Sequence, residues 1–140
     1  MHIQSILVAF DGSEPSERAL ALAEDLSAQY GARLLLVTVL QPLAPMGLVP
    51  MPESPTTEDL ARARQDLEVR ARGLRARGRT VETQVEVGIP AQTLLELADR
   101  FVVSAIVAGR SGKGAIGRAL MGSVTTSLLH HSVRPIVVVP

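Results

Sequence analysis

The 140-residue sequence contains no cysteine and no tryptophan, and aromatic side chains make up only 2% of it. The lack of cysteine excludes disulfides, thiolate metal sites and cysteine nucleophiles. Proteins that bind single-stranded nucleic acids stack the bases on aromatic side chains, so the scarcity of aromatics argues against that class. The hydrophobic core is therefore expected to consist of Leu, Val, Ile and Ala.

Long apolar stretches are missing as well. No run approaches the roughly 18 residues that cross a bilayer. Asp11 interrupts the first apolar run, and no basic region precedes that run. We therefore expect no membrane span, no secretory signal and a cytoplasmic location. Residues 1–140 are expected to form a single domain, which buries roughly two thirds of its unfolded surface.

Acidic residues are absent from the C-terminal part of the chain. Between Phe101 and Pro140 there are four positive charges and no Asp or Glu, whereas the whole chain has 14 basic and 14 acidic residues. The residues before Phe101 therefore carry fourteen acids against ten bases. Lys113, the only lysine, lies in the positive region, and a field of one sign attracts anionic ligands.

A glycine-rich stretch follows the apolar run that ends at Ala108. It begins at Gly109 and passes through Gly112 to Gly122, with two and nine residues between these glycines. Glycines after a strand let the backbone approach a ligand, and free N–H groups before a helix favour anions such as phosphate. Together with Lys113, this pattern predicts a phosphate-binding loop. The alternative is a glycine-rich surface loop without a ligand.

Two other phosphate-loop motifs do not fit this stretch. Residues 112–117 match G-x-G-x-x-G, but the dinucleotide motif follows an early strand and requires a ribose-binding acid about 20 residues later. No acid follows here. Walker A requires a glycine where this chain has Val107, and a Ser or Thr where it has Gly114.

Catalytic and metal-ligating sets are also missing from the sequence. The histidines, at positions 2, 130 and 131, have no carboxylate or cysteine at ligand spacing. Ser123 and Thr125 have hydroxyls but no nearby general base, so hydrogen bonding at a helix start is their expected role. We predict no catalytic residues and no metal ligands.

Apolar patterns predict alternating strands and helices. Strands are expected at 3–10, 34–40, 80–87, 101–108 and 135–140. Helices are expected from Ser13 to Gly31, from Thr56 or Thr57 past residue 74, from Pro90 to residue 101, and from about residue 117 or 120 to 131. This alternation predicts parallel right-handed crossovers and a three-layer α/β/α fold, with a five-stranded parallel sheet in the order 3-2-1-4-5.

The long helix after residue 56 and the segment before it have distinct compositions. Residues 41–55 contain five of the nine prolines, which indicates a lid or a dimer-contact loop, with simple disorder as the alternative. The helix combines leucines every seven residues with acid–base pairs four apart, namely Glu58–Arg62, Asp66–Arg70 and Glu68–Arg72. Interleaved acids favour a solvated helix over a nucleic-acid-binding face.

A ligand in such a sheet binds beyond the carboxyl ends of the strands, where the strand order reverses. In the order 3-2-1-4-5 the first and fourth strands are neighbours, so Asp11 is expected to face Gly109 across that crevice. Its carboxylate can accept a hydrogen bond from a sugar or base, or hold a metal-bound water near phosphates. The alternative is that Asp11 is only a turn residue of the Asp-Gly pair.

These motifs resemble those of the universal stress protein family over the whole chain. The matching pieces are Val8-Ala9-Phe10-Asp11-Gly12-Ser13, Leu36-Val37-Thr38-Val39, Gly109-x2-Gly112-x9-Gly122-Ser123-Val124 and Pro135-Ile-Val-Val-Val-Pro140. The resemblance implies an adenine nucleotide alpha-hydrolase-like fold. Because the glycine motif is intact, it also implies the ATP-binding branch of the family rather than the branch that lacks this motif. The departures are Gly117 and Arg118 within the spacer, and the proline-rich loop.

The resemblance further implies which residues bind the nucleotide. At the adenosine end these would be Ala9, Phe10, Asp11 and Val39. Around ribose and phosphates they would be Gly109, Arg110, Gly112, Lys113, Gly122, Ser123, Val124 and Thr125. The phosphates would hold Mg²⁺ or Mn²⁺, and homodimers would form through residues 136–139. The implied function is an ATP-binding switch, or a chaperone-like partner of an unknown protein, in the stress response. The alternatives are a slow ATPase or self-phosphorylating enzyme, and a nucleotide-free dimeric scaffold.

Overall fold

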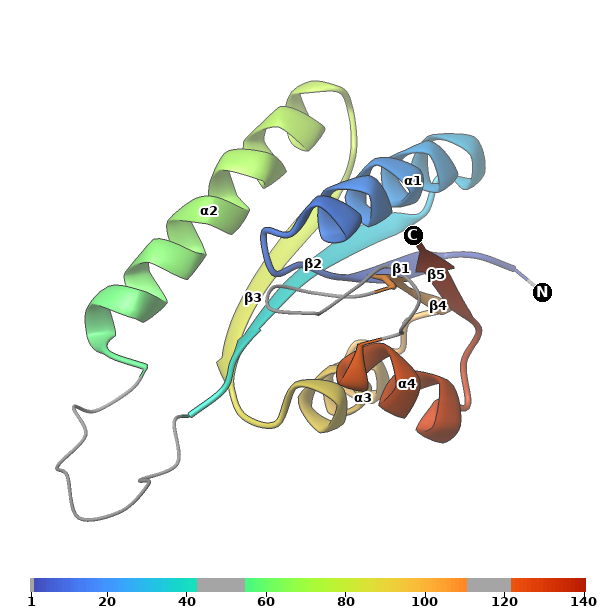
Figure 1. Cartoon of the computed structure of the whole chain (residues 1–140). Coiled ribbons are helices and arrows are strands. Elements are labelled where there is room, and N and C mark those ends of the chain that lie inside the picture. The colour runs from blue at the N-terminus through green and yellow to red at the C-terminus, as the bar shows by residue number, and fades with distance from the viewer. Residues whose placement is uncertain (1, 43–54, 111–121) are drawn as a thin grey trace, which may run out of the picture.

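Strands and helices alternate along the chain, as the sequence predicts (Figure 1). The computed structural model describes residues 2–42, 55–110 and 122–140. The strands are β1 (Ser5–Ala9), β2 (Arg33–Leu40), β3 (Val81–Val87), β4 (Ala105–Gly109) and β5 (Ile136–Val139). The helices are α1 (Glu14–Tyr30), α2 (Thr57–Ala76), α3 (Pro90–Arg100) and α4 (Ser123–His131).

The five strands form one parallel sheet in the order β3-β2-β1-β4-β5, which confirms the predicted order. Val8 of β1 pairs with Leu36 of β2 on one side and with Val107 of β4 on the other. The chain runs outward from β1 to β3 and then returns to place β4 on the other side of β1. The strand order therefore reverses between β1 and β4, at the centre of the sheet.

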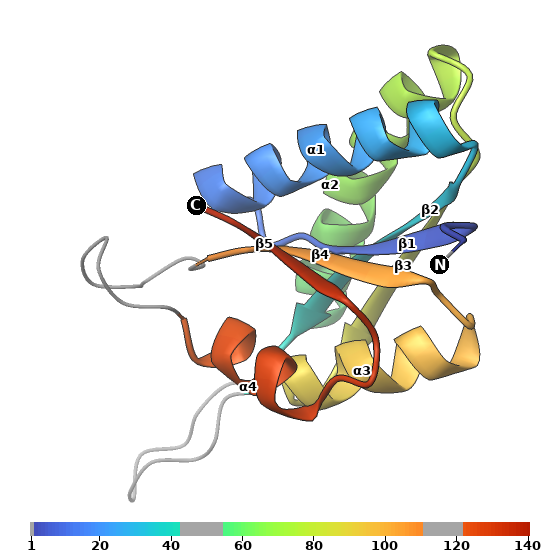
Figure 2. The same ribbon diagram turned by 90° about the vertical axis from the view of Figure 1, so that its right-hand side faces the viewer.

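Helices cover both faces of the sheet, α1 and α2 on one face and α3 and α4 on the other (Figure 2). The alternation of side chains along the strands gives each face its own aliphatic core. Residues of β1, β2 and β4 pack against Ala19, Leu67 and Leu74 on the α1–α2 side. On the other side they pack against Leu94, Leu97 and Leu128 of α3 and α4. Each helix buries one apolar stripe.

The predicted helix-start signals are confirmed where α1 and α2 begin. The hydroxyl of Ser13 accepts a hydrogen bond from the N–H of Ser16 at the start of α1, and Gly31 ends that helix in the left-handed conformation. Thr56 and Asp59 form a capping box at the start of α2, with each side chain bonded to the other residue's N–H. No helix within the described ranges is long and apolar enough to cross a membrane.

Two predicted boundaries were wrong. The fourth strand begins at Ala105 rather than Phe101, because Phe101 still donates to Leu97 of α3 and Val102 turns the chain with φ 51°. The last helix begins at Ser123, because Gly122 before it has an extended backbone with φ −64° and ψ 155°. Most of the predicted proline-rich loop, residues 43–54, lies outside the described residues.

Only one of the three predicted ion pairs along α2 forms, between Glu58 and Arg62 at 3.9 Å. Arg70 instead pairs with Glu17 of α1, and Glu68 pairs with Arg75, which lies two turns further along α2. The polar side of α2 is therefore not only solvated, because Arg70 reaches across to α1.

Candidate functional site

Asp11 lies just beyond β1, and Gly109 is the last residue of the neighbouring strand β4. β1 ends at Ala9 and β4 ends at Gly109, and these strands pair in parallel. Parallel strands bring their carboxyl ends to the same edge of the sheet, which is where open α/β sheets bind ligands. The predicted adjacency of the first and fourth strands is thus confirmed.

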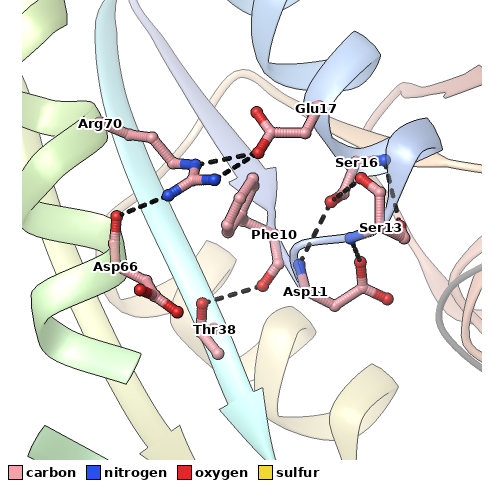
Figure 3. Close-up of polar contacts among 8 residues, drawn as sticks. All are labelled: Phe10, Asp11, Ser13, Ser16, Glu17, Thr38, Asp66 and Arg70. Carbon is pink, nitrogen blue, oxygen red and sulfur yellow. Dashed lines mark hydrogen bonds and ion pairs between the residues drawn. The ribbon is translucent and has the colours of Figure 1, made fainter. Parts of the chain in front are cut away.

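Asp11 begins the tight turn between β1 and α1 (Figure 3). Its Oδ1 accepts a hydrogen bond from the N–H of Ser13 at 2.9 Å, while Gly12 adopts φ 80°, which a side chain would oppose. The N–H of Asp11 lies 3.4 Å from the hydroxyl of Ser16. The turn role that the Asp-Gly pair predicts is therefore confirmed. Asp11 is also solvent-exposed, so its carboxylate reaches the surface at the carboxyl edge.

Gly109 is close to α1, a contact that the sequence analysis missed. A Cβ at position 109 would lie 2.7 Å from Pro15 Cβ, 2.8 Å from the Pro15 carbonyl carbon and 3.0 Å from the Ser16 N atom. Two of these atoms belong to backbone, which cannot move aside as the end of a side chain can. Glycine is required here because the start of α1 packs directly on the end of β4. This packing holds the Asp11 turn against β4.

Three hydrogen bonds join the end of β4 to the start of α4 and to β5. Arg110 donates its N–H to Val139 O of β5 at 2.6 Å, and its carbonyl accepts from Gly122 N at 2.9 Å. The hydroxyl of Thr125 donates to Gly109 O at 2.8 Å, and Thr125 is only 3% exposed. The hydroxyl proton of Thr125, a predicted phosphate contact, is thus used to fasten α4 to β4.

The N-terminus of α4 has no side-chain cap, in contrast to α1 and α2. Gly122 stands at the cap position, and no side chain there bonds the helix. The first turn of a helix presents N–H groups without intrahelical partners and the positive end of the helix dipole. In α4 these groups belong to Ser123 and Val124 and to Thr125, so three predicted residues present backbone donors at the carboxyl edge.

Arg110, whose carbonyl is bonded to Gly122 before α4, has a cationic side chain. Its Nε is buried and has no hydrogen-bond partner within the part of the chain that the structure describes. A buried donor without a partner is costly, which makes it a frequent mark of a ligand or water position. Uncapped helix N–H groups and a guanidinium nitrogen without a partner among the described residues are donors of the kind that bind anions.

Three of the predicted site residues have apolar side chains on the α3–α4 side of the sheet. Ala9, Val39 and Val124 are all partly buried, and all three pack against the core on that side. They come from β1, β2 and α4, so three predicted residues that are distant in sequence lie against the same core. Phe10 does not join them. It is 5% exposed and packs in the core on the α1–α2 side, opposite to Ala9.

Two predicted site residues, Gly112 and Lys113, lie outside the described residues. In the described ranges, no group of three or more His, Cys, Asp or Glu side chains is placed to hold a metal ion. Two of the described carboxyl groups with lowered pKa values lie elsewhere: a hydrogen bond from Arg77 lowers the pKa of Glu24, and the Thr56 N–H lowers the pKa of Asp59. Glu24 lies in α1, and Asp59 is part of the capping box of α2.

Comparison with known proteins places this architecture in a family. The profile of the universal stress protein family matches residues 2–140. A universal stress protein of Thermus aquaticus is 31% identical over 137 residues, which cover 97% of this chain and 98% of that protein. The structure of universal stress protein UspA from Lactobacillus plantarum shares the fold, with a TM-score of 0.83 at 20% identity over 100% of this chain and 99% of that one. A universal stress protein solved in complex with cAMP is 26% identical, with a TM-score of 0.73 over 99% of this chain and 98% of the other.

Proposed function

The chain belongs to the universal stress protein family, and we propose that it binds ATP between the Asp11 turn and the start of α4. The observation that carries the proposal is the uncapped N-terminus of α4, whose cap residue Gly122 is hydrogen-bonded to Arg110. The buried Nε of Arg110 without a partner supports an anionic ligand at this place. The phosphates bind the helix N–H groups and Arg110.

The adenosine end of the nucleotide lies against the apolar surface of Ala9, Val39 and Val124 in this proposal. The exposed carboxylate of Asp11 accepts a hydrogen bond from the base or the ribose while it keeps the Ser13 N–H. The relative that binds cAMP supports an adenine nucleotide as the ligand class. Gly112 and Lys113 belong to the proposed site through the sequence motif.

A divalent cation, Mg²⁺ or Mn²⁺, accompanies ATP in this proposal and is held by the phosphates. The described residues supply no cluster of ligands for a resident metal, which fits a cation that arrives with the nucleotide and keeps several waters. The cation would neutralise phosphate charge. The residues of this chain bind and orient the nucleotide.

We assign the protein the role of a nucleotide-dependent switch that acts on an unidentified protein partner. The last strand, β5, supports a homodimer in the same proposal, because its four apolar residues are all only half-buried at the edge of the sheet. An edge strand with unpaired backbone groups invites another strand. Dimerisation through β5 would place two nucleotide sites in one assembly.

Calorimetry with ATP and Mg²⁺ tests nucleotide binding, with Gly122→Val as the main variant. The φ and ψ of Gly122, −64° and 155°, suit any residue, so valine should preserve the fold while its side chain blocks the helix start. We expect saturable binding by the wild type and loss of at least tenfold in affinity for Gly122→Val. Equal binding by both proteins, or none at millimolar ATP, would reject the site and favour a nucleotide-free scaffold.

Incubation with γ-labelled ATP separates the switch from its enzymatic rival. The rival transfers the γ-phosphoryl group to water or to a hydroxyl such as that of Ser123, which is exposed at the start of α4. Label retained as intact ATP supports the switch. Released phosphate, or label on the protein that Ser123→Ala removes, would make the protein a slow ATPase or a self-phosphorylating enzyme.

A further inference from the structure

Arg70 of α2 contacts both ends of the segment that carries Asp11. Its Nε donates to Glu17 Oε1 at 3.1 Å, and its Nη2 donates to the same oxygen. Its guanidinium also lies over the Phe10 ring, 4.6 Å from the ring centre. Phe10 immediately precedes Asp11, and Glu17 belongs to the first turn of α1, so Arg70 contacts a residue on each side of the Asp11 turn (Figure 3).

Phe10, on one side of the Asp11 turn, is held in place by two hydrogen bonds to β2. Phe10 donates its N–H to Val37 O at 2.8 Å, and its carbonyl accepts from the Thr38 hydroxyl at 2.9 Å. β2 therefore fixes the backbone of Phe10 through both its N–H and its carbonyl. The Phe10 ring, over which the Arg70 guanidinium lies, is attached to this fixed backbone.

On the other side of the turn, Glu17 connects to Asp11 through one helical turn. Its N–H donates to Ser13 O at 3.0 Å, and the N–H of Ser13 binds the Asp11 carboxylate. The hydroxyl of Ser16 also binds Ser13 O, at 2.9 Å. A displacement of Glu17 would move the N–H group that orients the Asp11 carboxylate.

The ion pair between Arg70 and Glu17 is more than a solvated surface contact. The side chains of Arg70 and Glu17 are 32% and 43% exposed, and Arg70 also donates from Nη1 to the Asp66 carbonyl of its own helix. Arginine has a planar fork that binds in a fixed geometry and stacks on an aromatic face, which lysine cannot reproduce. The position of Arg70 is thus determined by three different contacts.

We propose that Arg70 and Glu17 are positioning residues of the nucleotide site and set its affinity by holding the Asp11 carboxylate in place. This inference rests on the proposed function. It adds that α2, which contributes no residue to that site, is coupled to it. A change that moves α2 would alter nucleotide affinity through Arg70.

The fold supplies a matched control for this inference. Arg77, the residue that caps the C-terminus of α2, and Glu24 of α1 form a second ion pair between the same two elements, with bonds from Nε to Oε1 and from Nη2 to Oε2. This pair and the Arg70–Glu17 pair each join residues 53 apart in sequence. Glu24 lies two turns beyond Glu17 along α1 and so further along the chain from Asp11, so loss of Arg77 should weaken the helix contact alone.

Calorimetry with ATP and Mg²⁺ on wild type, Arg70→Met and Arg77→Met tests the coupling. We expect Arg70→Met to weaken ATP binding about five- to tenfold and Arg77→Met to leave it within twofold. Arg70→Lys should recover only part of the loss, because lysine keeps the charge without the fork. Equal affinities of the Met variants, with the wild type binding ATP, would overturn the inference and leave the proposed function intact.

A double-mutant cycle distinguishes positioning from general destabilisation. If Arg70 acts through the Asp11 carboxylate, Arg70→Met should have little effect on affinity when Asp11 is already Ala. An undiminished effect in the Asp11→Ala background would overturn the inference.

Amide hydrogen exchange of the nucleotide-free proteins gives a readout that does not need ATP binding. Arg70→Met should accelerate exchange of the Ser13 N–H, and Arg77→Met should not. If the wild type fails to bind ATP but this selective acceleration appears, the proposed function is wrong while the structural coupling stands. No selective acceleration would reject the coupling itself.

Discussion

Gly109 of β4 and Pro15 of α1 lie so close that no side chain fits between them. A Cβ at position 109 would be 2.8 Å from the Pro15 carbonyl carbon, closer than two such atoms can approach without a shift of the backbone. This contact joins the end of β4 to the start of α1, directly after the turn that carries Asp11. It gives a reason for glycine at position 109 that does not depend on any ligand.

Gly109→Ala should therefore destabilise the fold by about 1–3 kcal/mol, the usual cost of inserting a methyl group into a filled position. The control is Gly73→Ala in α2, where the new Cβ would meet only the end of the Arg77 side chain at 3.5 Å. That change should stabilise the helix by roughly 0.5–1 kcal/mol. Urea unfolding measures both, and an equal, favourable effect of the two changes would disprove the close contact.

Val102→Gly should stabilise the protein. Val102 adopts a left-handed backbone with φ 51° just after α3, and it is 73% exposed. A β-branched residue is strained in this conformation, and burial of its side chain offsets little of that strain. Relief of that strain is expected to contribute about 1 kcal/mol. Val133, which is 91% exposed, provides the control, because Val133→Gly should only increase the entropy of the unfolded chain. A lower unfolding midpoint for Val102→Gly than for the wild type would contradict this prediction.

Val138→Pro should convert the proposed dimer to a monomer with little effect on the fold. The carbonyls of Pro135 and Val139 accept hydrogen bonds from Ile106 of β4 and from Arg110 just after it, so by alternation the N–H of Val138 points to the open edge of the sheet. Proline removes that donor and leaves the pairing with β4 in place. Sedimentation velocity measures the outcome, with Val133→Ala as an exposed apolar control. A dimer that survives Val138→Pro would place the interface elsewhere.

Stability should decline on acidification through two carboxyl groups. The Arg77 hydrogen bond lowers the pKa of Glu24 from its ordinary value of 4.5, and the Thr56 N–H lowers the pKa of Asp59 from 3.8. Because both pKa values are lower in the folded state, the two carboxyl groups contribute their full stabilisation when the pH is above their ordinary pKa values. This stabilisation is lost as the pH falls through the lowered pKa values of the folded state.

The double variant Glu24→Gln with Asp59→Asn should accordingly show a weaker decline of the urea midpoint between about pH 6 and pH 3 than the wild type. At neutral pH the variant should be the less stable protein, and the two curves should converge in acid. Parallel curves would mean that neither carboxyl group contributes to the pH dependence.

Most of the element boundaries could be predicted because their signals are local, and the strand order was predicted from the alternation of strands and helices. Ser13 and Gly31 mark the ends of α1 by capping chemistry, and Thr56 with Asp59 marks the start of α2. The start of β4 could not be predicted, because the apolar residues 101–103 fit the end of a helix as well as the start of a strand.

The candidate site could be located from sequence but its supports could not. Asp11 and Gly109 follow apolar runs, so their place at the carboxyl edge follows from the topology. The contact of Gly109 with Pro15, and that of Arg70 with Glu17, join residues far apart in the chain. The sequence favoured Asp66 as the partner of Arg70, because four residues along a helix bring side chains together. In the structure the Arg70 side chain instead pairs with Glu17 of α1.

The hydrogen bond between Gly122 N and Arg110 O closes the chain at the base of the segment that separates them. Where two positions of a chain are fixed in this way, doubling the number of residues between them costs only about 0.6 kcal/mol. Insertions and deletions between Arg110 and Gly122 are therefore inexpensive for the sheet and for the Asp11 turn.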